Sequence, residues 1–305
     1  MSVAHLPDAI ERAVGPGAME GAAQDKPHPF ASIAALCPVG AFDSGMGGLS
    51  VIAELRRLLP HEDIIYYGDN AHCPYGERPD EWLRERSAWI TAFLLSRGAK
   101  TVVVACNAAS AAGLEHLRAI YPLPIVGLVP AVKPAVESTR TGVVGVLATQ
   151  AAIRGRLLAD VIDRFATPAG VEVVKVAPEG WVEAVERGDL DTPQTEESVR
   201  RFLAPMLERN ADAIVFGCTH YPFLYSIVRK VIGDRIRLID SGDGVSRQTA
   251  RVLASHGLLY PGERKGKLTV YTSADPDIMR PLVWRLVGEQ VQVLGDTPTP
   301  NPLIP

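Results

Sequence analysis

The sequence predicts an α/β protein of two similar domains, each built on a parallel sheet, with a ligand site in the cleft between them. Residues 101–106 and 213–218 are short apolar runs that each end in a cysteine, a pattern typical of buried parallel strands. Residues 39–44 and 144–149 form a second pair of similar runs at nearly the same offset, which favours an internal duplication. Because ligands of open α/β sheets bind beyond the carboxyl ends of the strands, both cysteines are expected to face one shared cleft.

Length and composition allow this organisation and exclude several classes of function. The chain has 305 residues, of which 47% are hydrophobic, and this is enough for two ordinary domains. The formal net charge of -4 offers no basic field for nucleic acid or an anionic membrane surface. No apolar run is long enough to cross a bilayer, and residues 1–36 lack the pattern of a secretory signal. We therefore expect a cytoplasmic protein that binds a small molecule, with no nucleic acid and no membrane partner.

The cysteines point to the same compartment. The four of them lack the close spacing of a disulfide scaffold or a zinc ribbon, so free thiols in a reducing cytoplasm are expected. We interpret Cys37 and Cys73 as inert packing, which is the commonest role of a single buried cysteine. Cys106 and Cys218 differ from them because each stands at the end of a predicted strand.

Composition also suggests the domain boundaries. Residues 1–36 mix proline, glycine and charge and are expected to form a disordered extension, while residues 296–305 form a proline-rich tail. Several prolines between residues 122 and 134 mark a crossing between domains. The first domain is therefore expected to comprise residues 37–131 and 240–295, and the second domain residues 132–239.

Hydrophobic periodicity predicts the individual elements. In the first domain we expect strands and helices to alternate over residues 39–43, 49–59, 64–69, 81–97, 101–106, 109–120 and 125–129. The second domain should contain strands over residues 144–149, 171–176, 213–218 and 236–240 and helices over residues 181–187, 195–209 and 223–232. A helix over residues 244–259 returns to the first domain, where strands 267–272 and 291–294 flank a helix over residues 276–287.

Two loops at predicted strand ends are candidates for ligand contacts. The glycine-rich turn at residues 44–48 opens a helix whose first N–H groups could hold an anion, although it could equally serve only to turn the chain tightly. Its spacing is neither that of a Walker loop nor that of a dinucleotide fingerprint. The second loop, residues 70–79, follows the next strand and is rich in polar and aromatic side chains.

Three chemistries fit a pair of facing thiols. A disulfide redox couple is one, although redox pairs usually share a Cys-x-x-Cys turn. A metal site of Cys106, Cys218, His220 and Asp43 is another, although these residues lack dense ligand spacing. In the third, one thiolate removes a proton from carbon while the opposite thiol delivers one to the other face, which inverts the stereocentre.

Four motifs carry a family resemblance. Residues 43–50, 68–76, 105–110 and 217–222 resemble, in order, the signature motifs of glutamate racemases. The Cys-Thr-His-Tyr-Pro form of the last motif distinguishes the chain from aspartate racemases, which share the fold and both cysteines. The resemblance implies two flavodoxin-like three-layer domains related by a pseudo-twofold axis. It also implies a two-base racemase without cofactor or metal, acting as a homodimer that supplies D-glutamate for peptidoglycan synthesis.

The same resemblance implies roles for individual residues. Cys218 would deprotonate L-glutamate and Cys106 D-glutamate, with His220 and Asp43 as their respective supports. The implied substrate-binding residues are Asp43, Ser44, Pro74, Tyr75, Gly76, Asn107, Ala108, Thr149, Glu186, Thr219 and His220. Glu186 matches the glutamate of the family only if one residue is inserted before it, so Glu183 is a rival.

Two departures from the family pattern bear on substrate range. Ala108 and Ala152 stand where the family usually has threonine, and each lost hydroxyl removes a hydrogen bond worth about 1 kcal/mol. A racemase for aspartate or another amino acid therefore remains an alternative. A binding or regulatory protein on the same scaffold, without catalysis, is a second alternative.

Overall fold

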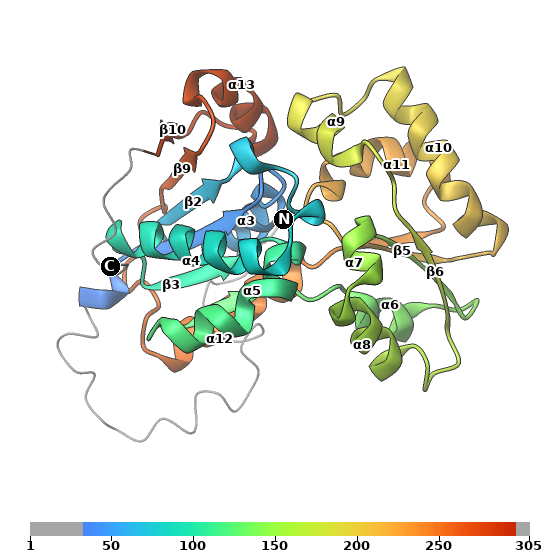
Figure 1. The fold of residues 1–305 in the computed structure, drawn as a ribbon, viewed down its shortest axis with the longest axis horizontal. Coiled ribbons are helices and arrows are strands. Elements are labelled where there is room, and N and C mark those ends of the chain that lie inside the picture. The colour runs from blue at the N-terminus through green and yellow to red at the C-terminus, as the bar shows by residue number, and fades with distance from the viewer. Residues whose placement is uncertain (1–32, 297–305) are drawn as a thin grey trace.

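The computed structural model describes residues 33–296, and Figure 1 shows them as two lobes, each with a sheet and helices packed around it. Most of the predicted extension and tail lies outside the described residues. Within them, no helix is long and apolar enough to span a membrane.

The first lobe contains a six-stranded sheet in the order β10-β9-β2-β1-β3-β4, in which every neighbouring pair is parallel. Its strands are β1 Val39–Asp43, β2 Ile64–Gly68, β3 Thr101–Val104, β4 Ile125–Gly127, β9 Leu268–Thr272 and β10 Gln292–Gly295. Its helices are α3 Leu49–Leu58, α4 Asp80–Ser96, α5 Asn107–Ile120, α12 Gly242–Ser255 and α13 Pro276–Val287. Helix α12 packs against α3, which confirms that the chain returns to this lobe.

The second lobe contains a four-stranded parallel sheet in the order β6-β5-β7-β8. Its strands are β5 Val143–Leu147, β6 Glu172–Val176, β7 Ala213–Phe216 and β8 Arg237–Ile239. Its helices are α6 Val132–Ser138, α7 Gln150–Arg154, α8 Arg156–Phe165, α9 Trp181–Arg187, α10 Pro193–Glu208 and α11 Tyr225–Ile232.

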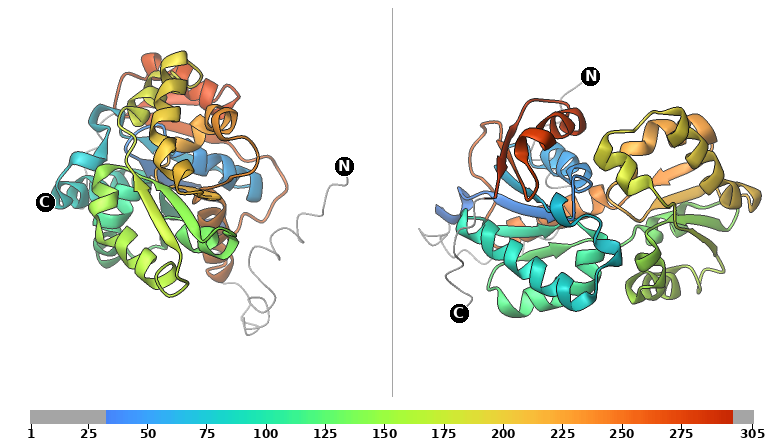
Figure 2. Two further views of the ribbon diagram at one scale, coloured as in Figure 1. Left: turned by 90° about the vertical axis from the view of Figure 1, so that its right-hand side faces the viewer. Right: turned by 45° about the horizontal axis from the view of Figure 1, so that its top comes forward.

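The two sheets share a strand order. In the first lobe β2-β1-β3-β4 is the order of the four strands that come first in the chain, and β6-β5-β7-β8 repeats it in the second lobe. The predicted likeness between residues 39–44 and 144–149, and between 101–106 and 213–218, thus pairs β1 with β5 and β3 with β7. The prediction of two similar α/β domains is confirmed, and the right-hand view of Figure 2 shows the two lobes side by side.

Each sheet is covered on both faces by apolar side chains. Ala41 and Phe42 are adjacent in β1, yet they belong to separate buried clusters, because successive side chains of a strand point to opposite faces. Val146 and Leu147 divide between two clusters in β5 in the same way. Buried sheets of this kind hold their carboxyl-end loops in fixed positions.

The sequence prediction missed several short elements. Helices α6, α7 and α8 were not predicted, and the loop 70–79 contains two short 3-10 turns, η1 Asn70–His72 and η2 Tyr75–Glu77. The predicted helix over residues 223–232 divides into a 3-10 turn, η3 Tyr221–Leu224, and α11. The sheet changes between β4 and β5 and again between β8 and β9, while the exact boundary residues of the domains stay a prediction.

Candidate active site

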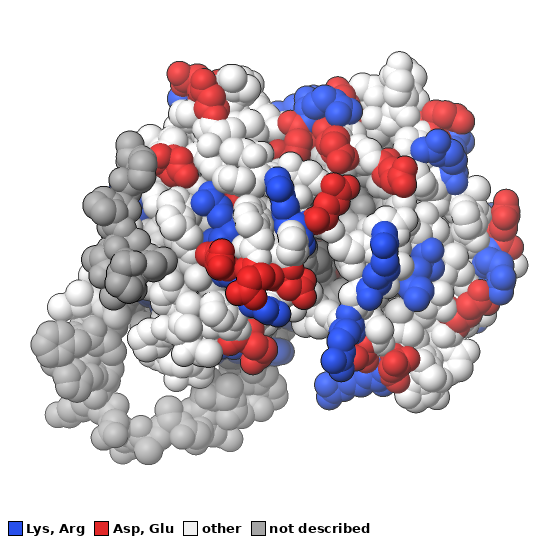
Figure 3. Space-filling model, in the orientation of Figure 1, with Lys and Arg blue, Asp and Glu red and all other residues white. Residues whose placement is uncertain are grey.

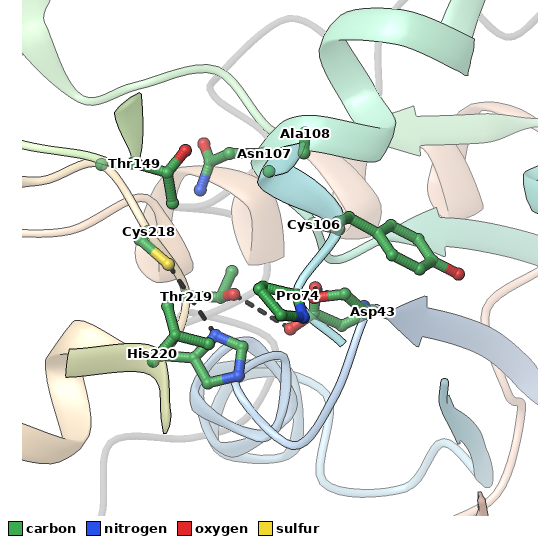
Figure 4. A pocket seen from close by; sticks show the side chains of 14 residues that line it. Asp43, Pro74, Cys106, Asn107, Ala108, Thr149, Cys218, Thr219 and His220 are labelled. Carbon is green, nitrogen blue, oxygen red and sulfur yellow. Dashed lines mark hydrogen bonds between the residues drawn. The ribbon is translucent and has the colours of Figure 1, made fainter. Parts of the chain in front are cut away.

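A pocket lies where the carboxyl ends of strands from both sheets meet. It encloses about 340 Å³ of empty space, including its open mouth. Its lining residues are Asp43, Ser44, Pro74, Tyr75, Gly76, Cys106, Asn107, Ala108, Thr149, Val182, Gly217, Cys218, Thr219 and His220. Figure 3 shows the surface hollowed between the lobes, and Figure 4 shows the lining side chains at close range.

The strands position the chemical groups of this pocket. Asp43 is the last residue of β1, and Cys106 follows β3 after a single alanine. Thr149 and Cys218 each stand two residues beyond their strands, β5 and β7. The two cysteines therefore come from equivalent strands of the two sheets and open on one pocket, as the sequence predicted.

Cys106 lies beside a buried carboxylate. It is the N-cap residue of α5, and both it and Asp43 are buried. Burial raises the pKa of the Cys106 thiol well above its ordinary value, and the nearby Asp43 carboxylate raises it further. Burial also raises the pKa of Asp43, although the charge of His220 and a hydrogen bond with Cys106 oppose this. This surrounding favours Cys106 in its protonated form.

Cys218 lies beside a histidine instead. Its Sγ atom is 3.8 Å from Nδ1 of His220, whose Nε2 is 2.7 Å from Oε1 of Glu186. Burial alone would lower the pKa of His220, but its contacts with Cys218, Cys73 and Glu186 raise that pKa well above the ordinary value. The histidine therefore places a positive charge next to the Cys218 sulfur.

Glu186 is held by hydrogen bonds from the other lobe. The backbone N–H of Met46 donates to Oε1 at 2.6 Å, and Nδ2 of Asn70 donates to Oε2 at 2.7 Å. Burial raises the pKa of Glu186, but the hydrogen bond with His220, the charge of His220 and the hydrogen bonds from Met46 and Asn70 together outweigh it, so the net pKa is lowered. Glu186 thus remains a carboxylate that faces the imidazole.

Two further hydrogen bonds connect the lobes at the base of the pocket. The hydroxyl of Thr219 donates to Oδ2 of Asp43 at 3.0 Å, and the hydroxyl of Ser50 donates to the backbone oxygen of Thr219 at 2.9 Å. The backbone N–H of Ser44 donates to Oδ1 of Asp43 at 2.7 Å. Each oxygen of the Asp43 carboxylate therefore has a fixed donor.

The glycine-rich turn brings the first lobe close to the histidine. A Cβ atom on Gly45 would lie 2.2 Å from Oε1 of Glu186, and one on Gly47 would lie 2.3 Å from Nδ1 of His220. Both distances are too short for any side chain. The glycines therefore allow the turn to pack closely against His220 and Glu186. The sequence indicated only anion binding or a tight turn for these glycines.

Other lining residues present polar atoms to the pocket. Oδ1 of Asn107 is buried and has no hydrogen-bond partner among the described residues. Oγ1 of Thr149 accepts from the N–H of Ala152 at 3.3 Å, as the N-cap of α7, which leaves its own proton free. Tyr75 instead directs its hydroxyl to Asp69, which also forms an ion pair with Arg86, so its ring forms a wall.

The structure brings together nearly all of the predicted site residues. Of the predicted substrate-binding set, only Glu186 does not line the pocket, because it lies behind His220. The rival Glu183 lines a neighbouring cavity of about 800 Å³. Val182 and Gly217 also line the pocket and were missed, since an apolar side chain and a glycine carry no chemical signal.

The cysteines are all free, and one of them has an unexpected position. Among the described residues, the potential metal ligands that cluster are Cys73, Glu186 and His220, with ligand atoms within 4.8 Å of one another. This is not the set of Cys106, Cys218, His220 and Asp43 considered from the sequence. Cys73 is half-buried and lies against the histidine, so its interpretation as inert packing is incomplete.

Comparison with known proteins agrees with this geometry. A family model described as Asp/Glu/Hydantoin racemase matches residues 48–248. A glutamate racemase of Deinococcus radiodurans is 50% identical over 282 residues, which cover 92% of this chain and 96% of that protein. The chain belongs to the glutamate racemase family.

Solved glutamate racemases share the fold. The Escherichia coli enzyme, in complex with L-glutamate and the activator UDP-MurNAc-ala, is 32% identical with a TM-score of 0.75, covering 85% of this chain and 97% of that one. The Francisella tularensis enzyme, in complex with D-glutamate, is 28% identical with a TM-score of 0.74, covering 87% and 98%. These likenesses support the two α/β domains of a glutamate racemase.

The two residues that depart from the glutamate racemase pattern, Ala108 and Ala152, line the same cavity. Ala108 and Ala152 both line a side cavity of about 830 Å³, which shares Tyr75, Gly76 and Asn107 with the central pocket. Ala108 lines the central pocket as well, whereas Ala152 does not. The missing Ala108 hydroxyl is therefore the one that could affect substrate directly.

Proposed function

We propose that this chain interconverts L- and D-glutamate by proton transfer between two cysteine thiols, without a cofactor. The observation that carries this proposal is the pair of thiols, Cys106 and Cys218, which open on one pocket from equivalent strands of the two lobes. Inversion at carbon requires an acid and a base on opposite faces of the substrate, and two facing domains can supply them.

The surroundings of the two thiols suggest how a reaction cycle begins. In the direction from L- to D-glutamate, the Cys218 thiolate, beside the His220 cation, takes the α-proton. The C–H bond breaks, an S–H bond forms and the electron pair stays on carbon. The Cys106 thiol, whose raised pKa keeps its proton, then gives that proton to the opposite face. In the reverse direction, each sulfur takes the other role.

Polar groups of the lining would bind the substrate. The unpartnered Oδ1 of Asn107 is an acceptor suited to the ammonium group of an amino acid. The hydroxyl of Thr149, which only accepts a hydrogen bond from the described residues, is a donor suited to a carboxylate. The hydroxyls of Ser44 and Thr219 donate to Asp43 and would have to turn to reach the substrate. The L-glutamate and D-glutamate complexes of the Escherichia coli and Francisella tularensis relatives support glutamate as the ligand.

The biological setting is part of the same proposal. D-glutamate made by this chain would enter peptidoglycan synthesis in the cytoplasm. The Escherichia coli relative is bound to UDP-MurNAc-ala, a nucleotide-linked muramyl compound of the kind from which peptidoglycan is built, and this supports the role. We further propose a homodimer, which sedimentation of the purified protein tests directly: a single species of monomer mass would reject it.

The decisive experiment is exchange of the α-hydrogen with deuterated solvent, followed by NMR for both glutamate enantiomers. We expect exchange and racemisation with the natural chain, and a loss of racemisation of at least about a thousandfold in Cys106→Ser and in Cys218→Ser. Cys37→Ser is the matched control and should retain full activity, because this cysteine is outside the pocket. Absence of exchange with either enantiomer would indicate a binding protein, and turnover of aspartate alone would reject glutamate as the substrate.

A further inference from the structure

We propose that Cys73, Glu186 and His220 form an inhibitory binding site for a thiophilic divalent cation, for which Zn²⁺ is the probe. The three ligand atoms already lie within 4.8 Å of one another. The binding itself follows from this cluster alone. Only the inhibitory effect rests on the proposed racemase function.

The geometry is close to what a tetrahedral zinc site requires. With Zn–S near 2.3 Å and Zn–N and Zn–O near 2.1 Å, tetrahedral ligands stand about 3.4 to 3.6 Å apart. The Nε2 of His220 and the Oε1 of Glu186 are 2.7 Å apart, so they need to separate by less than about 1 Å to admit the ion. The Cys73 sulfur lies within 4.8 Å of one ligand atom of His220 and one of Glu186, so it needs to move by about 1 Å.

The three ligands come from three different segments. Cys73 lies between η1 and η2 in the first lobe, Glu186 is on α9, and His220 precedes η3 in the second lobe. A bound cation would therefore connect the two lobes directly behind the pocket wall that His220 forms.

Outer partners already orient the carboxylate ligand. Met46 and Asn70 each donate a hydrogen bond to Glu186, and Thr272 in turn donates to Oδ1 of Asn70 at 2.8 Å. Such second partners fix the ligands of metal sites. Gly45 packs closely against the cluster of ligands, because a Cβ atom at this position would lie 3.0 Å from the Cys73 sulfur.

The chemistry of the donor set selects the kind of metal. One sulfur, one imidazole nitrogen and one carboxylate oxygen suit Zn²⁺, whereas Mg²⁺ and Ca²⁺ prefer ligand sets made entirely of oxygen. Cys73 is half-buried and Glu186 is not fully enclosed, so an ion can reach the site from solvent. Water would occupy the fourth position, as in other three-ligand zinc sites.

Metal binding would hold the two lobes together beside the pocket. The Cys73 thiol and the His220 imidazolium each release a proton to solvent, and their lone pairs bind the cation. The ion replaces only the proton on Nε2 of His220, so the proton on Nδ1, which faces the Cys218 sulfur at 3.8 Å, stays in place. Inhibition would come instead from the link between the lobes, which would hinder opening of the pocket. The expected result is reversible inhibition that a chelator relieves.

The test compares Cys73→Ala with Cys37→Ala, which removes the other half-buried cysteine at a distance from the site. Calorimetry with Zn²⁺ and the thiolate-to-metal absorption of bound Co²⁺ measure binding without any need for activity. We expect one equivalent to bind to the natural chain and to Cys37→Ala, and an affinity at least about 100-fold weaker in Cys73→Ala, since loss of an outer partner alone costs 10–100-fold.

Racemisation assays with and without Zn²⁺ provide the second readout. Zn²⁺ should inhibit the natural chain and Cys37→Ala, while whatever activity Cys73→Ala has without Zn²⁺ should resist the same concentration. Equal binding and equal inhibition in all three proteins would overturn the proposal, because the ion would then sit on the catalytic thiols. Absence of binding up to millimolar Zn²⁺ would overturn it as well. If no variant racemises glutamate but Cys73-dependent binding persists, the metal site stands and the proposed function fails.

Discussion

The two thiols of the pocket stand at the ends of equivalent strands, yet opposite charges surround them. Cys106 faces the carboxylate of Asp43, and its pKa is raised by burial and by that charge. Cys218 faces the imidazole of His220, whose pKa is raised by contacts with Cys218, Cys73 and Glu186. The same strand-and-loop arrangement thus places a carboxylate beside one thiol and an imidazole beside the other, because the neighbouring side chain differs.

This difference shows how proton transfer on the two faces of one substrate can be assigned to two cysteines with unlike neighbours. A racemase must remove a proton on either face, and each sulfur must be able to give and to take. The unequal surroundings raise the pKa of the Cys106 thiol by burial and by the Asp43 charge, while the Cys218 sulfur lies beside the His220 imidazole.

The largest expected effect comes from removing these charges. Asp43→Asn and His220→Asn should each lower kcat by about 100-fold, the ordinary scale for a group that assists proton transfer. Because the two enantiomers have equal energy, kcat/KM must fall equally in both directions. The asymmetry should appear in the primary isotope effect of each substrate. For Asp43→Asn, the isotope effect should be larger with α-deuterated D-glutamate than with the L-enantiomer. For His220→Asn, it should be larger with α-deuterated L-glutamate. The same pattern in both variants would contradict the assignment of one support to each thiol.

A smaller effect is expected from the pH dependence of His220. Its pKa is raised above 6.5, so its charge and the stability it contributes are present below pH 6.5 and are lost only as the pH rises through the higher folded-state value. Glu186→Gln removes one cause of that rise, and the alkaline limb of kcat/KM should move to lower pH, with about a tenfold loss at pH 8. NMR of the imidazole measures the same shift independently of activity. An unchanged titration would show that Glu186 does not control this proton.

The smallest expected effect is at the pocket wall. Ala108→Thr adds a hydroxyl next to Asn107, and a new hydrogen bond worth about 1 kcal/mol should lower the KM for glutamate about fivefold with little change in kcat. Ala111→Thr is the matched control, because this alanine lines the side cavity and not the central pocket. A KM that falls equally in both variants would point to a general effect on α5 instead of a contact with substrate.

Much of the fold could be predicted because its strands are buried. Each predicted strand corresponds to a strand of the structure, since an apolar run between turn residues is a strong local signal. Helix α8 carried a comparable signal in Leu158, Val161, Ile162 and Phe165, which recur at helical spacing, and the prediction overlooked it. Helix α6 was hidden by Pro134, which suggested a linker. Within the first turn of a helix proline is tolerated, because the N–H there has no partner to lose.

The site was predictable where a motif carried it, and not where it depends on distant contacts. Cys106 and Cys218 could be placed in one pocket from their strands alone. The approach of Cys73 to His220 could not, because it depends on how the loop after β2 packs against the opposite lobe. Glu186 was ambiguous with Glu183 for the same reason: only the fold shows which carboxylate of α9 reaches the imidazole.

The hydrogen bond from Thr219 to Asp43 connects more than two side chains. Thr219 lies between Cys218 and His220 in the chain, while Asp43 is the proposed support of Cys106, so this contact joins the two halves of the proposed proton-transfer site. A movement that separates the lobes at this point would break it, together with the hydrogen bond from Met46 to Glu186. Closure of the lobes around the substrate would then also assemble both acid–base pairs. In the open form, the molecule would not transfer protons to or from any bound compound.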